Sequence, residues 1–241
     1  LSSRIQNEAF NKDNVNKTII RNYIRYYLRL PIKSEYTIDD MADDGVSVLD
    51  HLNIENAHIL GISMGGMIAQ IMASSYPEKT KTFTLIASTA STPSPFNGPS
   101  KDVRRLFIER TKNVDATIED RVNRTKKLFK LIGYEGIDLD TQEFSDNVKL
   151  SIERGGVDDT GFGRQLTAIL GSKNRIEKVR SISAPTLIIH GKEDPLIGVK
   201  NAYRSNKLIK GSKLVIIDNM RHLIEPPVFD QFKSDLLAHL K

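Results

Sequence analysis

The chain has 241 residues, enough to bury a sizeable core as one domain with an insertion or as one and a half domains. Its 39% hydrophobic and 27% charged residues are typical of globular proteins. The sequence contains no cysteine, which excludes a disulfide framework, a thiolate nucleophile and a cysteine-based metal site. The net charge of +5 comes from dispersed basic residues without a recognisable nucleic-acid motif, and no apolar run approaches the ~20 residues of a membrane span. We therefore expect no nucleic-acid partner and no membrane span.

The first clear secondary-structure signal is a helix that begins after Thr37. Residues 5–35 are polar and then aromatic and basic, with only weak helical periodicity over 19–30. Asp40 follows Thr37 by three residues, which forms a capping box. One helical face is then predicted to comprise Ile38, Met41, Gly45, Val48, Leu49 and Leu52.

An acidic cluster lies at the start of this predicted helix, at Asp39, Asp40, Asp43 and Asp44. A metal site is one interpretation of such a cluster. Favourable charge at a helix start and a solvated helix face explain it more simply, and we expect no metal there.

Residues 57–73 predict a strand, a tight turn and a helix around Ser63. An apolar run from 57 to 62 leads into Gly61-Ile62-Ser63-Met64-Gly65, and a helix-forming run follows from 67 to 73. A serine on such a turn has a cramped backbone, which the glycines two residues away on either side would accommodate. The turn would direct the Met64 N–H, as an oxyanion-hole donor, at a charge developing beside Ser63. The alternative is an ordinary surface serine in a glycine-bracketed turn.

With these residues the chain resembles the α/β-hydrolase superfamily and, more narrowly, its aclacinomycin-methylesterase-like branch. The matching stretches are 41–44, 48–52 and 57–70. The resemblance implies an α/β fold, with a mostly parallel sheet flanked by helices and a helical cap insertion. In this family a segment like residues 1–4 follows several strands, so we expect the chain to lack the N-terminal strands and the His-Gly loop that supplies a second oxyanion donor.

The middle of the chain changes from strand and helix to helix alone. Tyr76-Pro77 ends the helix after Ser63, and 82–88 is a second buried strand, which favours a parallel sheet. Residues 92–99 are rich in helix and strand breakers, and 100–180 are charged and helical with no strand signal. The predicted parts are the N-terminal core at 1–93, the cap at 94–180 and the C-terminal core at 181–241. Pocket lining and cap core both remain open for Phe96, Phe107, Phe129, Leu131 and Phe162.

Strands return at 184–191 and 213–218, each followed by a polar loop. Pro226-Pro227 then opens an amphipathic helix. Its apolar face is predicted to comprise Phe229, Phe232, Leu236 and Leu240.

Three residues follow strand ends in the order that α/β-hydrolases use, namely Ser63, Asp194 and His222. A serine hydroxyl needs an adjacent base, and the base needs a carboxylate that fixes its tautomer, so these three are the predicted catalytic residues. The competing histidines fit less well, because they precede a strand, lie in helices or end the strand before the acid: His58, His51, His239 and His190. Glu193 and Asp218 are the alternative acids.

The resemblance implies a serine esterase that cleaves carboxylic esters of small to medium substrates through an acyl-enzyme, with a small-molecule ester as its partner and no metal or organic cofactor. A cytoplasmic location is expected, and the sequence does not indicate an oligomeric state. Two alternatives stay open. One is other α/β-hydrolase chemistry, such as perhydrolase or haloperoxidase activity, C–C bond hydrolysis or peptide cleavage. The other is a non-catalytic binding protein with the same fold.

Overall fold

The computed structural model describes residues 15–91, 98–112, 116–155 and 159–241. Its sheet has four parallel strands in the order β1-β2-β3-β4. They are β1 (Ala57–Ile62), β2 (Thr80–Ile86), β3 (Thr186–Gly191) and β4 (Lys213–Ile217). Ile62 pairs with Ile86, which pairs with Ile189, so the carboxyl ends of the strands meet at one edge of the sheet.

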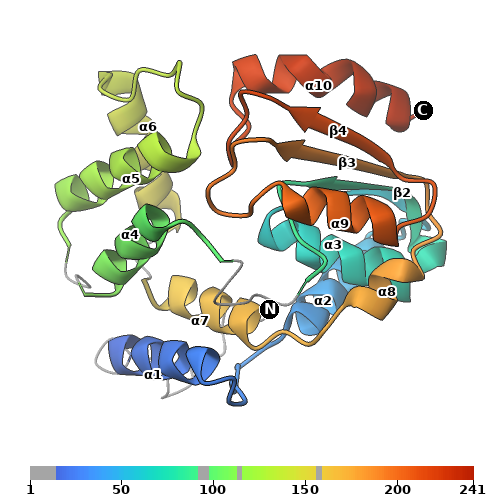
Figure 1. Ribbon diagram of the computed structural model, residues 1–241, viewed down its shortest axis with the longest axis horizontal. Helices are drawn as coiled ribbons and strands as arrows, with labels where there is room; N and C mark the ends of the chain where they lie inside the picture. The colour runs from blue at the N-terminus through green and yellow to red at the C-terminus, as the bar shows by residue number, and fades with distance from the viewer. Residues whose placement is uncertain (1–14, 92–97, 113–115, 156–158) are drawn as a thin grey trace.

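Helices cover both faces of the sheet (Figure 1). One face packs against α10 (Pro226–His239), and the other against α3 (Met64–Ser75), α8 (Ile176–Arg180) and α9 (Lys200–Leu208). Successive side chains of a strand point to opposite faces of the sheet, so alternate residues pack in the two helical layers. Phe83, Leu85 and Ile188 pack with α3, α8 and α9. Leu187 and Ile189 pack with Phe232 and its neighbours in α10.

Helix α2 (Ile38–His51) begins at the predicted capping box, since Thr37 and Asp40 bond each other's backbone N–H. Its buried residues are Ile38, Ala42 and Val46, which pack on α3. The predicted face was wrong for Val48 and Leu52, which are 57% and 58% exposed. Val48 lies about 120° around the helix from Ala42, on the side turned away from α3.

The end of α3 and the apolar face of α10 lie where the sequence predicted them. Helix α3 stops at Ser75, and a single 3₁₀ turn, η3 (Pro77–Lys79), leads into β2. In α10 the side chains of Phe232 and Leu236 are buried, and Phe229 and Leu240 pack partly buried beside them.

A helical cap separates β2 from β3, as predicted (Figure 1). It contains α4 (Lys101–Lys112), α5 (Ile118–Ile132), α6 (Gln142–Gly155) and α7 (Asp159–Leu170), and the described residues between β2 and β3 form no strand. Helix α1 (Val15–Tyr27) packs against α7 and α4. The N-terminal helix therefore covers the cap rather than the sheet.

Strand β1 forms one edge of the sheet, and β2 is its one partner among the described residues. Leu60 and Ile62 pair with Thr84 and Ile86 and so point to the face that α10 covers over β3 and β4. Their side chains are nevertheless 44% and 43% exposed. Leu60 and Ile62 thus form an apolar strip on β1 that no described helix covers.

Candidate active site

Ser63 occupies the turn between β1 and α3 in a strained backbone conformation, with φ 53° and ψ −119°. Such angles are unfavourable for a residue with a side chain and persist only where the surroundings hold them. Here the Ser63 N–H donates to the Ile86 carbonyl at 3.0 Å, and the Ser88 hydroxyl donates to the Ser63 carbonyl at 2.6 Å. The end of β2 and the residues just after it therefore fix the turn that presents Ser63.

The glycines around this turn differ in how tightly they are packed. A Cβ on Gly61 would overlap the backbone of Gly65 and Gly66. A Cβ on Gly65 would meet nothing within 4 Å, so the prediction that both bracketing glycines make room was wrong for Gly65. The second crowded glycine is Gly66, whose Cβ would lie 2.6 Å from the Cβ of Ser88. Helix α3 packs so closely on β2 and the residues after it that position 66 has no room for a side chain.

Asp194 and His222 are in direct contact at the carboxyl ends of β3 and β4. His222 Nδ1 lies 2.7 Å from Asp194 Oδ2, and the two side chains are 5% and 0% exposed. A carboxylate only accepts hydrogen bonds, so Nδ1 carries the proton and the neutral imidazole has its lone pair on Nε2. The backbone N–H groups of Leu196 and Ile197 each donate to Asp194 Oδ1 at 2.8 Å.

His190 is a second partner of this carboxylate, which the sequence did not predict. Its Nε2 lies 2.7 Å from the Ile197 carbonyl, so that nitrogen carries a proton, and 3.4 Å from Asp194 Oδ2. Burial by itself raises the pKa of the Asp194 carboxyl, but hydrogen bonds from His190 and His222 outweigh it and lower the pKa to about 2. Asp194 is therefore ionised throughout the neutral range.

The loop that carries His222 is held by both the sheet and the cap. At the end of β3, a Cβ on Gly191 would overlap the carbonyl oxygens of Met220 and Arg221, so the loop crosses directly over this glycine. On the other side, the N–H groups of His222 and Leu223 donate to the Ile132 carbonyl at the end of α5, at 2.8 and 3.2 Å. The cap thus helps to place the histidine.

Ser63 and His222 both follow strands at the same edge of the sheet, but no hydrogen bond joins them in the part of the chain that the structure describes. Catalytic hydrogen bonds in ligand-free enzymes are often long and tighten when substrate binds. Of the three predicted catalytic residues, the structure brings Asp194 and His222 into contact and places Ser63 with Asp194 on one cavity wall.

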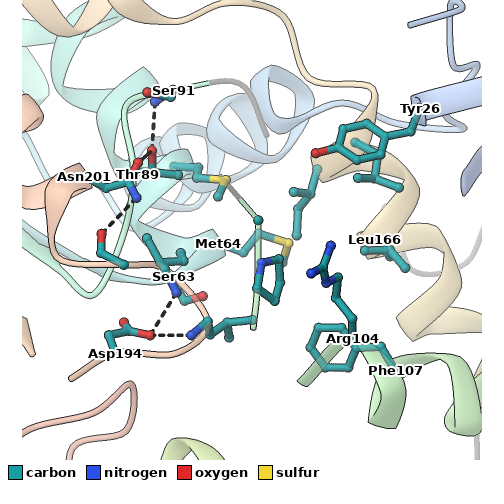
Figure 2. A pocket seen from close by; sticks show the side chains of 18 of the residues that line it. Tyr26, Ser63, Met64, Thr89, Ser91, Arg104, Phe107, Leu166, Asp194 and Asn201 are labelled. Atoms are coloured by element: carbon teal, nitrogen blue, oxygen red, sulfur yellow. Dashed lines mark hydrogen bonds between the residues drawn. The ribbon is translucent and has the colours of Figure 1, made fainter. Parts of the chain in front are cut away.

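The cavity has a volume of about 780 Å³ and lies between the sheet edge and the cap (Figure 2). Ser63, Met64 and Asp194 lie on one side of it, and Arg104, Phe107 and Leu166 on the other. Tyr23, Tyr26 and Tyr27 of α1 also contribute. This size suits a small to medium organic ligand.

The aromatic residues of the cap divide between the two roles that the sequence left open. Phe107 and Phe162 line the cavity, with their ring centroids 5.6 Å apart. Phe129 packs against Phe144 at 5.3 Å and is cap core. Phe96 lies outside the described residues.

Arg175 is a buried positioning residue for which the sequence offers no signal. It is 2% exposed, and burial lowers the pKa of its guanidinium to about 10. Its nitrogens donate to four acceptors at 3.1 to 3.4 Å, namely Gln70 Oε1, Ser172 Oγ and the carbonyls of Thr89 and Ser91. The loop after β2, which lines the cavity, is thereby tied to α3 and to the segment before α8.

Three of the four acidic residues at the start of α2 have structural partners. Asp40 caps the helix, Asp39 pairs with Lys178 at 2.6 Å, and Asp43 accepts a hydrogen bond from Tyr76 at 2.6 Å. Within the described residues no group of three or more histidine or acidic side chains is placed to hold a metal ion. None of the described helices combines the length and apolarity needed to cross a membrane.

Comparison with known families agrees with this architecture. The family model described as alpha/beta hydrolase fold matches residues 16–224. The chain belongs to this family. The strand-turn-helix around Ser63 and the cap between β2 and β3 are thus features of an alpha/beta hydrolase.

Several members of the family are similar to this chain. Rhodomycin D methylesterase of Streptomyces peucetius is 25% identical over 221 residues, which cover 86% of this chain and 74% of the relative. 3-Oxoadipate enol-lactonase 1 of Acinetobacter baylyi is 24% identical over 207 residues, which cover 85% and 73%. Among solved structures, the meta-cleavage product hydrolase of Pseudomonas fluorescens matches with a TM-score of 0.66 at 22% identity over 87% of this chain and 73% of that one. The methylesterase relationship agrees with the branch that the sequence resembles.

Proposed function

We propose that this alpha/beta hydrolase is a serine esterase that cleaves carboxylic esters of small to medium substrates through an acyl-enzyme. The observation that carries the proposal is the buried Asp194–His222 pair at 2.7 Å, on the same sheet edge as the strained Ser63. Two relatives named a methylesterase and an enol-lactonase support ester chemistry, because both names describe ester hydrolysis.

In the first half of the reaction, the Ser63 hydroxyl attacks the ester carbonyl and its proton passes to His222 Nε2. Asp194 stays ionised, because its pKa is lowered to about 2, and stabilises the imidazolium that forms. The Met64 N–H belongs to the first turn of α3, where no intrahelical acceptor exists, so it is available to the developing oxyanion.

In the second half, His222 returns the proton to the departing alkoxide, which leaves as the alcohol while the acyl group stays on Ser63. Water then attacks the acyl-enzyme, with His222 as the base, and releases the carboxylic acid and free Ser63. His222 thus carries the proton in both steps, and the products are the alcohol and the carboxylic acid.

The test is hydrolysis of p-nitrophenyl acetate and butyrate together with labelling by a fluorophosphonate probe. We expect Ser63→Ala to abolish turnover and labelling, and Asp194→Asn to lower kcat by about 10²- to 10⁴-fold. Ser74→Ala is the matched control, since Ser74 lies in α3, the helix that follows Ser63, and its hydroxyl donates to the Ile71 carbonyl. It should keep both activities.

Two outcomes would count against the proposal. If the folded protein neither reacts with the probe nor hydrolyses either ester, the non-catalytic binding alternative is favoured. If Ser63 is labelled but no ester in a broad panel is cleaved, another α/β-hydrolase reaction, such as C–C bond hydrolysis, is favoured.

A further inference from the structure

The charged side chains of the cavity are unbalanced in sign. Asp194 is its one carboxylate among the described lining residues, and that charge is already engaged by two histidines and two backbone N–H groups. The lining also includes four cationic side chains, Arg104, Lys192, Lys200 and Arg204. Lys192 pairs with Asp218 at 2.7 Å. The cavity therefore presents an excess of positive charge to whatever enters it.

Arg104 is the cation placed inside the cavity, opposite the candidate catalytic residues. It lies in the first turn of α4, is partly buried, and faces Ser63 and Asp194 across the space (Figure 2). No carboxylate forms an ion pair with it in the part of the chain that the structure describes. Its neighbour Arg105 points away from the cavity and pairs with Glu109 at 3.0 Å. The Tyr27 hydroxyl accepts a hydrogen bond from Arg104. A partly buried guanidinium whose partner is a phenol rather than a carboxylate has N–H groups left for an anion.

The surroundings of Arg104 suit an anion at the end of an apolar chain. Phe107 and Leu166 lie beside it on the same side of the cavity (Figure 2). Burial raises the pKa of Tyr23 to about 12, so this phenol remains a neutral donor, and Tyr26 lines the same side. A planar guanidinium binds the two oxygens of a carboxylate through parallel N–H groups. Exposed Lys200 and Arg204 add positive charge that would attract anions towards the entrance.

We propose that Arg104 binds a carboxylate at the end of the substrate remote from the scissile ester, and that the preferred substrates are esters bearing a free carboxylate, such as half-esters of dicarboxylic acids. The ester part of this statement rests on the proposed function. The anion-binding part rests on Arg104 and the cavity alone.

The first test compares p-nitrophenyl half-esters of glutarate, adipate and suberate with methyl-ended esters of equal chain length. We expect wild type to favour the best half-ester about tenfold or more in kcat/KM, since a charge-assisted bidentate contact discriminates on this scale. Arg104→Met should bring that ratio close to one. Arg105→Met, the same change one residue along α4, should keep the wild-type ratio. Equal kcat/KM values for the two series in wild type would overturn the proposal, as would an unchanged ratio in Arg104→Met.

The second test does not depend on hydrolysis. Calorimetric titration of Ser63→Ala with adipate, hexanoate and hexanamide should show about tenfold tighter binding of the carboxylates than of the amide. The preference should be lost when Arg104→Met is added and kept with Arg105→Met. Equal binding of hexanoate and hexanamide overturns the Arg104 subsite even if esters are cleaved. Arg104-dependent carboxylate binding without any ester hydrolysis supports the subsite and overturns the esterase proposal.

Discussion

His222 Nδ1 lies 2.7 Å from Asp194 Oδ2, and both side chains are shielded from water, at 5% and 0% exposed. In such a desolvated pair the carboxylate is stabilised by its donors rather than by solvent. Asp194 has four of these, in His222, His190 and the N–H groups of Leu196 and Ile197. The pair should therefore affect the stability of the fold as well as the chemistry.

Acid should destabilise the protein through Asp194. Its pKa in the folded state is about 2, below the ordinary 3.8, so the unfolded chain takes up the proton first. The stabilisation is complete at pH values above the ordinary pKa and is lost as pH falls towards 2, and a shift of this size corresponds to roughly 2 kcal/mol. Urea unfolding between pH 6 and 3 should show a steeper loss of unfolding free energy in wild type than in Asp194→Asn, which cannot ionise. Parallel curves would contradict this prediction.

The glycines at the Ser63 turn should differ in tolerance to alanine. Gly61→Ala and Gly66→Ala introduce a Cβ into space that backbone and Ser88 already fill, and each should lower the free energy of unfolding by about 3 kcal/mol. Gly65→Ala meets open space and serves as the matched control, with an expected change within about 0.5 kcal/mol. Chemical denaturation of the three variants is the measurement. A Gly65→Ala variant as unstable as the other two would contradict the open space beside Gly65.

Replacing Arg175 should loosen the loop after β2. Arg175→Met removes the donors of three buried hydrogen bonds and one partly buried one, and it leaves oxygens such as Gln70 Oε1 without that partner, which should cost about 3 kcal/mol of stability. Arg180→Met is the control, because Arg180 is exposed and pairs with Glu177, and such surface pairs contribute at most about 1 kcal/mol. Urea unfolding separates the two. Similar stability losses in both variants would argue against a structural role for Arg175.

The uncovered apolar strip on β1 should promote self-association. Leu60 and Ile62 present adjacent apolar surface on an edge strand, and such edges pair with other chains. Sedimentation velocity over a range of concentrations should show larger species in wild type, and Leu60→Thr with Ile62→Thr should shift the protein towards monomer while keeping strand-forming side chains. Leu237→Gln removes an apolar side chain of similar exposure from α10 and should have little effect. A wild type that stays monomeric at high concentration would refute this expectation.

The elements of the sheet could be predicted because their local signals are strong. Strand β1 coincides with the apolar run 57–62, and Tyr76-Pro77 ends α3 because proline cannot continue a helix. The contact between Asp194 and His222 followed from the rule that parallel strands bring their carboxyl ends to one edge. The remaining features depend on tertiary packing.

Three such features lay beyond the sequence. The crowding at Gly66 comes from how closely α3 approaches Leu85 of β2 and Ser88 just after it. His190 became a partner of Asp194 because the loop after β3 folds back over it. Arg175 lies in a charged, polar stretch of sequence, and only the packing of α8 on α3 reveals that it is buried.

The cap insertion also bears on how the site is assembled during folding. Ile86 of β2 pairs with Ile189 of β3, so the central pairing of the sheet joins segments separated by about a hundred residues. Closing a chain loop of that length costs on the order of 4 kcal/mol in entropy, and parallel pairings of high sequence separation form slowly. Ser63 lies before this junction, and Asp194 and His222 lie after it. During refolding, activity should therefore return only with the slowest closure of the sheet, after the local helices of the cap have formed.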